Sequence, residues 1–219
     1  MDVFQRVVLN NADALLSGLW VTIQISAIAF VLAVVLGFGA AMVRLYVRPL
    51  RHVAELYIQF CRNTPIFVQL LWVAYVWPDL LGWPRSFFAA GFVALALQSS
   101  GYLAETFRAG IQGMDRGQRE SAYSLGMSPS LTMRRIVLPQ VLLVMSPAIM
   151  NQFLVVVKSS TLVSVIAVPD LMYHALRLTR VWLEPIEILT VTACLYIAMV
   201  FTLSSLIKLY TDRLRTRFG

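Results

Sequence analysis

Long apolar segments separated by short polar stretches dominate the pattern of this chain. Five of them approach the length of about 20 residues that an α-helix needs to cross about 30 Å of hydrocarbon. We therefore predict five membrane-spanning helices, over residues 15–44, 53–82, 86–108, 136–158 and 184–210. Since no linker, low-complexity segment or repeat divides the chain, the pattern favours an all-α membrane protein with a single transmembrane domain over residues 1–219.

The composition excludes an ordinary soluble domain, because 59% of the residues are hydrophobic and only 13% are charged. A net charge of +7 can indicate a nucleic-acid partner, but the basic residues are spread along the chain instead of forming one patch. Twelve of the 18 Lys and Arg residues fall on one side if the first span runs inward, so the positive-inside rule places the N-terminus outside and the C-terminus in the cytoplasm. These twelve residues are Arg44, Arg48, Arg51, Arg108, Arg116, Arg119, Arg134, Arg135, Lys208, Arg213, Arg215 and Arg217.

The connection between the third and fourth spans, about residues 111–135, is long for a simple connector and has structural signals of its own. We expect Gly117 to open a short helix and Gly126 to close it in the left-handed conformation. Ser128 followed by Pro129 predicts an N-cap and the start of a second helix, and Pro139 is expected to mark the beginning of the fourth span. The prediction is a helix, a tight turn and another helix; an ordinary polar loop is the alternative.

Polar residues within the apolar segments indicate a cavity or a partner, because they are unfavourable in hydrocarbon. The candidates for a polar pathway are Arg62, Gln69, Gln98, Asn151, Gln152, Lys158, Ser159, Ser160 and Thr161. Each has an alternative. Thr64 and Pro65 can cap and begin a helix that breaks the second span, with Arg62 snorkelling to the membrane surface. The amides can bond neighbouring helices, and Lys158 can mark the outer interface. Glu105 and Arg108, three residues apart on one helix, predict a structural ion pair.

The long connection also carries a recognisable spacing: "ESA", three residues, Gly126, nine residues and "IVLP". It resembles the EAA loop of ABC-importer permeases, with Ser121 in place of the usual alanine. Four further segments resemble the polar amino acid uptake branch of that family, similar to its histidine and glutamate/glutamine permeases: "RNTPIFVQL", "GYLAETFRAGI", "GQRESAYSLGM" and "KSSTLVSVIAVPDL". Together these matches extend across most of the chain after the first span.

The resemblance implies the five-helix permease (MetI-like) fold and a cytoplasmic coupling helix that binds an ATPase. The coupling residues would be Glu120, Ser121, Ala122, Gly126, Ile136, Leu138 and Pro139. The implied partners are two ABC ATPase subunits, an identical or paralogous permease, an external solute-binding protein and a small zwitterionic substrate. The implied location is the bacterial inner membrane. In that setting Lys158 and the hydroxyls of residues 159–161 would offer donors to a substrate carboxylate.

Other function classes lack their sequence signals. The chain has no G-x4-G-K-[ST] sequence, so we expect ATP and Mg²⁺ to be bound by a partner ATPase, with no cofactor in this chain. An intramembrane serine protease needs a nucleophile beside a base, but G-x-S-x-G is absent and His174 is predicted outside the bilayer. A secondary transporter would show inverted repeats and no ATPase-docking loop. His52 and His174 stand alone, so no metal site and no catalytic residue is expected.

Overall fold

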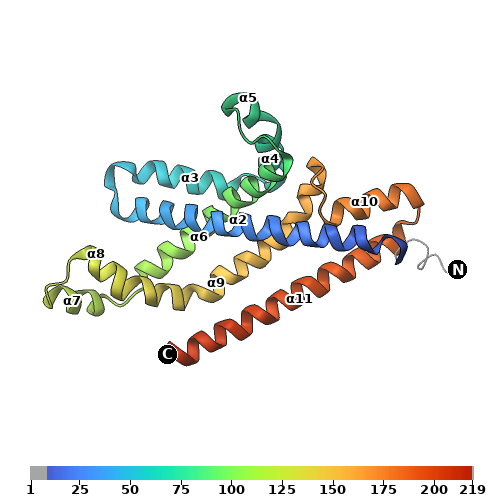
Figure 1. Cartoon of the computed structure of the whole chain (residues 1–219). Helices are drawn as coiled ribbons and strands as arrows, with labels where there is room; N and C mark the ends of the chain where they lie inside the picture. Colours follow the sequence, from blue (N-terminus) through green and yellow to red (C-terminus); the bar gives the residue numbers. More distant parts are fainter. Residues whose placement is uncertain (1–8, 219) are drawn as a thin grey trace.

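The computed structural model describes the backbone of residues 9–218 and their side chains, except at residues 9, 116, 119, 210, 212 and 214–218. All elements in this range are helices (Figure 1). Along the chain they are η1 (Leu9–Asn11), α2 (Ala12–Tyr46), η2 (Arg48–Leu50), α3 (Arg51–Asn63), α4 (Ile66–Leu71), η3 (Trp72–Val76), α5 (Trp77–Leu81), α6 (Phe87–Gln112), α7 (Arg116–Ser124), α8 (Pro129–Thr132), η4 (Met133–Val137), α9 (Leu138–Ser159), η5 (Ser160–Ile166), α10 (Leu171–Trp182) and α11 (Pro185–Phe218).

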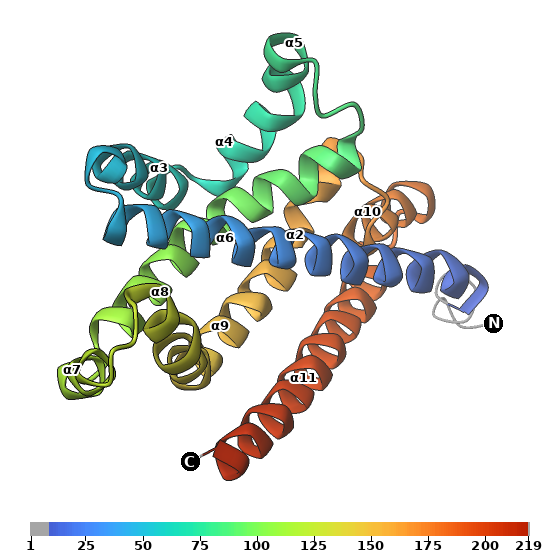
Figure 2. The same ribbon diagram turned by 60° about the vertical axis from the view of Figure 1, so that its left-hand side comes forward.

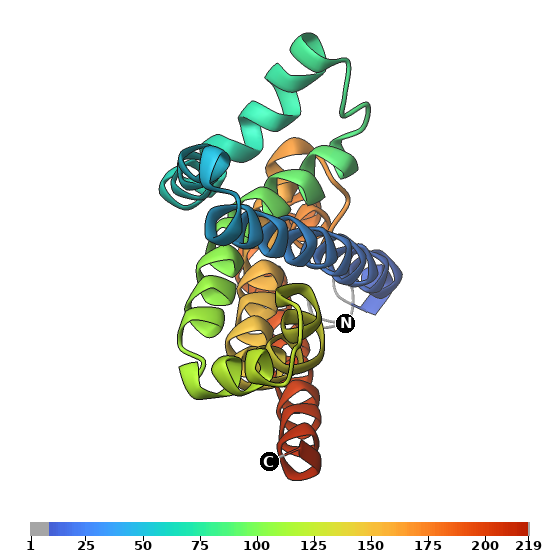
Figure 3. The ribbon, with the colours of Figure 1, turned by 90° about the vertical axis from the view of Figure 1, so that its left-hand side faces the viewer.

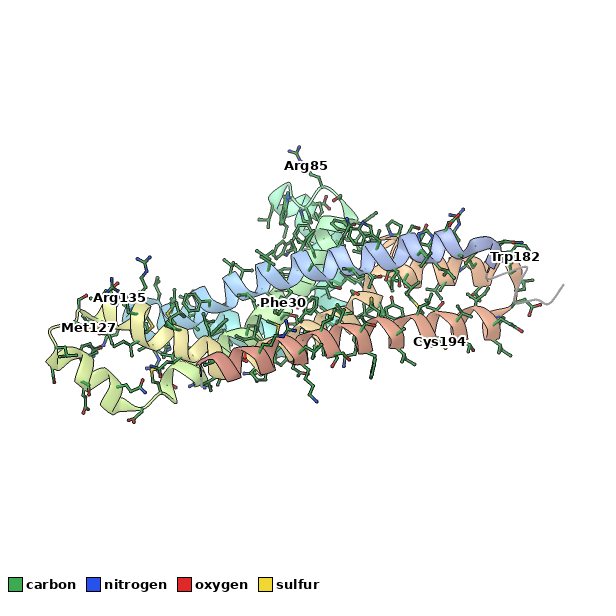
Figure 4. All side chains as sticks on the ribbon, turned by 60° about the horizontal axis from the view of Figure 1, so that its bottom comes forward. Phe30, Arg85, Met127, Arg135, Trp182 and Cys194 are labelled. Atoms are coloured by element: carbon green, nitrogen blue, oxygen red, sulfur yellow. The ribbon has the colours of Figure 1, made fainter. Side chains whose placement is uncertain are left out.

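Four helical stretches of the described chain are long and apolar enough to cross a membrane: Ala12–Tyr46, Phe87–Gln112, Pro129–Ile166 and Pro185–Leu209. A fifth span results if the pair Arg48–Asn63 and Ile66–Leu81 is counted as one. The start of α2 and α10 lie toward one end of the molecule, whereas α7 and the C-terminal end of α11 lie toward the other (Figures 1 and 2). The side chains of Trp182 and Met127 mark these two ends (Figure 4).

The second predicted span, residues 53–82, is bent by 107° at Thr64 and Pro65. Thr64 does not cap the next helix as predicted, because Pro65 itself is the residue before α4 and no side chain caps that end. A residue before proline avoids the helical conformation, and Thr64 is accordingly extended, with φ −80° and ψ 127°. The bend points α4 and α5 away from the C-terminal part of α11, on the opposite side of the molecule (Figure 3).

The centre of the bundle is the crossing of α2 and α6, where small residues let the two backbones approach closely. Small buried residues recur along α2 about one turn apart, at Gly18, Thr22, Ser26, Ala29, Ala33, Gly37 and Ala41. A Cβ atom on Gly37 would lie 2.8 Å from the carbonyl oxygen of Ser100. The largest hydrophobic cluster surrounds this crossing and includes Phe107 and Ile25.

Two π-helical turns each come directly before an X-Pro pair. The N–H of Trp77 donates to the carbonyl of Trp72 before Pro78, and the N–H of Leu138 donates to that of Met133 before Pro139. Proline lacks an N–H, and its ring crowds the carbonyl four residues earlier. The wider π turn accommodates the ring, so both helices continue past a residue that would otherwise break them. The helix that contains the fourth predicted span therefore begins before Pro139, at Pro129.

The amphipathic helix α10 was not predicted from the sequence, and it joins the start of α2 to α11 through a buried acid. Asp170 is fully buried and accepts hydrogen bonds from the N–H of Tyr173, at 2.8 Å, and from the hydroxyl of Tyr196, at 3.4 Å. The N–H of Leu171 donates to the hydroxyl of Thr22 on α2. Burial raises the pKa of Asp170 to about 6, even though its hydrogen bonds act in the opposite direction.

Ionisation of Asp170 should therefore destabilise this junction at neutral pH. Because the pKa in the folded state lies above the reference value of 3.8, the stability associated with this group is present below pH 4 and is lost as the pH rises through about 6. The full difference is about 3 kcal/mol. Asparagine keeps a cap acceptor but cannot ionise. We expect the thermal midpoint of Asp170→Asn, measured relative to that of the wild type, to increase between pH 4 and pH 7. If the difference between the two midpoints does not change with pH, the pKa of Asp170 is not raised.

Candidate functional site

The connection between α6 and α9 folds as the predicted helix, turn and helix. The short helix α7 begins at Arg116 instead of Gly117, because Asp115 caps it: Oδ1 of Asp115 accepts a hydrogen bond from the N–H of Gly117 at 2.9 Å. An aspartate two residues before this glycine was a readable N-cap signal that the prediction missed. The next helix starts as predicted, with the Ser128 hydroxyl accepting from the N–H of Leu131 and with Pro129 in its first turn.

Gly126 closes α7 in the left-handed conformation, with φ +76°. The N–H of Gly126 donates to the carbonyl of Tyr123, and the N–H of Met127 donates to that of Ala122. This pair of bonds is a complete Schellman motif, which requires a positive φ at the position of Gly126. The turn is thus fixed by backbone chemistry, and glycine is the residue that adopts it without strain.

The helix α7 has one packed side and one open side. Ala122 is 1% exposed and lies toward the rest of the molecule, where α7 contacts α8 and η4. Glu120, Ser121 and Leu125 are exposed, Leu125 at 83%. Of the remaining predicted coupling residues, Ile136 and Leu138 are half-buried and Pro139 is exposed. The exposed face therefore combines an acid, a hydroxyl and an apolar side chain, and the apolar side chain, Leu125, was not among the predicted coupling residues.

A second candidate region lies between α9 and α11, which run side by side (Figure 2). Two hollows occur along it. The Lys158 hollow, of about 510 Å³, is lined by Lys158 and Thr161 together with Tyr196, Ile197, Val200, Phe201 and Ser204 of α11. The Asn151 hollow, of about 280 Å³, is lined by Pro147, Asn151, Leu154, Ser204, Ile207, Lys208 and Thr211. Ser204 is common to both, so the two hollows are neighbours along one groove.

Lys158 lies at the edge of the Lys158 hollow, beside the side chains of α11. It faces α11 between Tyr196 and Ser204, which lie roughly 16 to 28 Å along that helix from Pro185 at 1.5 Å per residue. The side chain of Lys158 is exposed in the isolated chain. The groove therefore presents a cation beside a largely apolar wall.

The hydroxyl groups near Lys158 do not all serve as the predicted donors. The Ser160 hydroxyl is buried and donates to the carbonyl of Val157 at 2.8 Å, and the Thr161 hydroxyl donates to that of Lys158 at 3.0 Å. Of the two, only Thr161 lines the Lys158 hollow, where its oxygen remains available as an acceptor. Gln152 and Ser159 are half-buried and are not among the residues lining the two hollows.

The α11 side of the groove was missed. Tyr196, Ser204 and Lys208 repeat at intervals of four or eight residues, which places them on one helix face. That spacing was a readable signal within the fifth span.

The other predicted pathway residues lie elsewhere. Arg62 is exposed and stacks over the ring of Tyr102, with its guanidinium carbon 5.4 Å from the ring centre. Gln98 is half-buried in α6. Gln69 is fully buried just after the bend, and neither its amide nitrogen nor its amide oxygen has a hydrogen-bond partner. The structure therefore brings together Asn151, Lys158 and Thr161 but not these three residues.

Replacing Gln69 with leucine should stabilise this conformation. The buried amide leaves a donor and an acceptor unsatisfied, each at a cost of about 1–3 kcal/mol, whereas leucine has a similar volume and no polar atoms. We expect the thermal midpoint of purified Gln69→Leu to rise by about 2–10 °C, given about 2–4 °C per kcal/mol for a chain of this size. Gln69→Ala, which also removes the amide but leaves a cavity, should gain less. A lower midpoint for Gln69→Leu would show that the amide has a partner.

The predicted pair of Glu105 and Arg108 forms, with 2.8 Å between Oε2 of Glu105 and a guanidinium nitrogen of Arg108. It belongs to a larger network. Arg44 of α2 pairs with the same glutamate and, at 3.2 Å, with Glu55 of α3. The network ties three helices together near the end of the molecule that carries α7, which supports a structural role for Glu105.

Comparison with known proteins agrees with this geometry. Residues 33–216 match the family described as binding-protein-dependent transport system inner membrane component. The chain belongs to this family. Its relatives include the arginine transport system permease protein ArtQ of Bacillus subtilis (strain 168), which is 34% identical over 206 residues, covering 92% of this chain and 93% of ArtQ.

Two solved structures share the fold. The crystal structure of an amino acid ABC transporter with histidines contains a chain 36% identical to this one, with a TM-score of 0.87 over 97% of this chain and all of that chain. A chain of the MetNI methionine ABC transporter in an inward-facing conformation gives a TM-score of 0.81 at 15% identity, over 94% of this chain and 98% of that one, which shows a common fold. The predictions of an ABC-importer permease and of its all-α membrane fold are confirmed.

Proposed function

We propose that this chain forms half of the translocation pathway of an ATP-driven, binding-protein-dependent importer of polar amino acids or related zwitterions. Two comparisons support the substrate class: ArtQ is named for arginine transport, and the solved structure with 36% identity is described as an amino acid transporter. The groove supports it chemically. A cation in the groove attracts a carboxylate, and the neighbouring hydroxyl oxygens and Asn151 accept or donate hydrogen bonds to the rest of a zwitterion.

The observation that carries the proposal is a continuous helix between the two candidate regions. From Pro129, beside α7, the helix runs through the π turn and α9 to Ser159, next to Lys158. This is roughly 45 Å at 1.5 Å per residue. A force applied at α7 therefore reaches α8 and η4 through their packing contacts with α7, and then the wall of the groove along one helix. The π turn and Pro147 are the places along it where the helix can bend.

This arrangement also suggests where the partner subunits would bind and how the chain would be oriented in the membrane. The exposed face of α7, with Glu120 and Ser121, would bind one of two ABC ATPase subunits, and those subunits would bind ATP and Mg²⁺. The groove opens on one face of a single chain, so an identical or paralogous permease would close it. With α7 in the cytoplasm of a bacterial inner-membrane protein, the N-terminus and α10 face outward, where a solute-binding protein would deliver substrate. This chain would then act as a transport subunit and not as an enzyme.

Replacing Lys158 with alanine tests the groove. Losing a charge-assisted contact of about 1.5–3 kcal/mol predicts a loss of about tenfold or more in uptake kcat/KM, measured in proteoliposomes with the ATPase and the binding protein. ATPase subunits should still co-purify, because Lys158 lies far from α7 along the chain. Arg48→Ala removes an exposed cation of η2, outside the groove, α7 and α10, and serves as the control. Unchanged uptake in Lys158→Ala would remove Lys158 from the pathway.

A further inference from the structure

A third hollow lies where α7, α8 and η4 meet the C-terminal end of α2. This Arg134 hollow has a volume of about 400 Å³, within the range of small-molecule sites in proteins. Met42 of α2 lines one side and Tyr123 of α7 another, so a molecule bound there would contact both the first span and the short helix. The groove between α9 and α11 shares no lining residue with it.

The polar lining of the hollow suits an anion. Arg134 and Ser130 are exposed, and no acidic side chain is among the ten described residues that line the space. Among the described side chains, no carboxylate lies within 4 Å of the Arg134 guanidinium. Thr132, which also lines the hollow, is 1% exposed, and its hydroxyl has no hydrogen-bond partner. A buried hydroxyl without a partner is unfavourable, so a polar group of a bound molecule that reached Thr132 would stabilise the site.

The apolar lining distinguishes a lipid from a soluble anion. Met42 belongs to one candidate membrane span, and Val137 and Leu138 belong to another. The apolar wall is therefore continuous with helices that enter hydrocarbon, whereas Arg134 and Ser130 provide the polar edge. An amphiphile with an anionic head matches both surfaces, but inorganic phosphate would match only the second. Lipids of the cytoplasmic leaflet carry the required negative charge.

We propose that the Arg134 hollow binds the headgroup of an anionic phospholipid, which holds α7 against the end of α2. The orientation of the hollow toward the cytoplasmic leaflet rests on the proposed function. A bound lipid would stiffen the contact between the coupling helix and the first span, so anionic lipid should raise the number of substrate molecules transported per ATP hydrolysed.

The test uses the complete transporter, with its ATPase subunits, in nanodiscs of phosphatidylcholine with and without phosphatidylglycerol. Native mass spectrometry counts the phosphatidylglycerol retained per permease chain. Arg134→Gln should bind it about fivefold more weakly, since one basic residue contributes about 1 kcal/mol to such binding. Arg135→Gln is the matched control, because Arg135 is exposed, extends outward from the ribbon and does not line the hollow (Figure 4). It should retain lipid like the wild type.

Three outcomes would overturn the proposal. Equal retention by Arg134→Gln and Arg135→Gln would show that the hollow holds no lipid. Displacement of the lipid by inorganic phosphate would assign the hollow to a soluble anion. Retention by the permease alone, but not with its ATPase, would show that the ATPase fills the space. Lipid retention is measured without transport, so a failure here is distinct from a failure of uptake in phosphatidylcholine alone, which would count against the proposed function.

Discussion

Gly126→Glu should abolish uptake while leaving the permease folded in the membrane. Gly126 has a φ of +76°, which a residue with a side chain adopts at a cost of about 1–2 kcal/mol. That penalty alone reduces the population of the native turn by about 5- to 30-fold. A Cβ atom at this position meets no atom within 4 Å in this chain, so the substitution has room within the permease. The added charge then lies at the end of the helix that we assign to the ATPase contact.

Gly126→Asn is the matched control, because asparagine tolerates the left-handed conformation and adds no charge. We expect it to keep most of the uptake measured in proteoliposomes, and Gly126→Glu to lose at least 30-fold. Membrane insertion and monodispersity of the purified permease should be alike in both variants. If Gly126→Glu transports normally and its ATPase subunits still co-purify, α7 is not the docking element.

The features that sequence predicted well are those encoded by neighbouring residues. The turn at Gly126, the cap at Ser128 and the ion pair of Glu105 with Arg108 each depend on residues within a few positions of one another. Local backbone conformation and helical spacing decide them before any tertiary contact forms. The position of the bend at Pro65 was also predicted correctly, but the predicted cap by Thr64 does not form.

The features that sequence missed depend on contacts between distant segments. Arg44 pairs with a glutamate 61 residues away, and nothing in the local pattern selects that partner. Pro139 read alone predicts a helix start, because a proline inside a helix is unfavourable; the π turn that removes the conflict has no sequence signal of its own. Lys158 was predicted as a pathway residue, but the α11 side chains that line the same hollow were not, because the sequence does not show which helix faces α9.

The small residues of α2 also show what the sequence cannot predict. Their spacing is visible in the sequence, but the helix that they contact is not.

Gly37→Leu should prevent α2 from packing on α6, because its Cβ would lie 2.8 Å from the Ser100 carbonyl oxygen and 2.9 Å from Cβ of Leu103. One of these atoms is backbone and cannot move aside without shifting α6. We expect destabilisation of about 3 kcal/mol or more, at the upper end of overpacking effects.

Gly39→Leu provides the control for this crossing, two residues along the same helix. A Cβ atom on Gly39 meets no atom within 4 Å, so leucine there faces open space and should leave stability unchanged or raise it by about 1 kcal/mol through helix propensity. The measurement is the thermal midpoint and the monodisperse yield of both variants purified in the same detergent. At about 2–4 °C per kcal/mol, Gly37→Leu should lose about 6–12 °C. Equal midpoints for the two variants would contradict the close contact of α2 with α6 at Gly37.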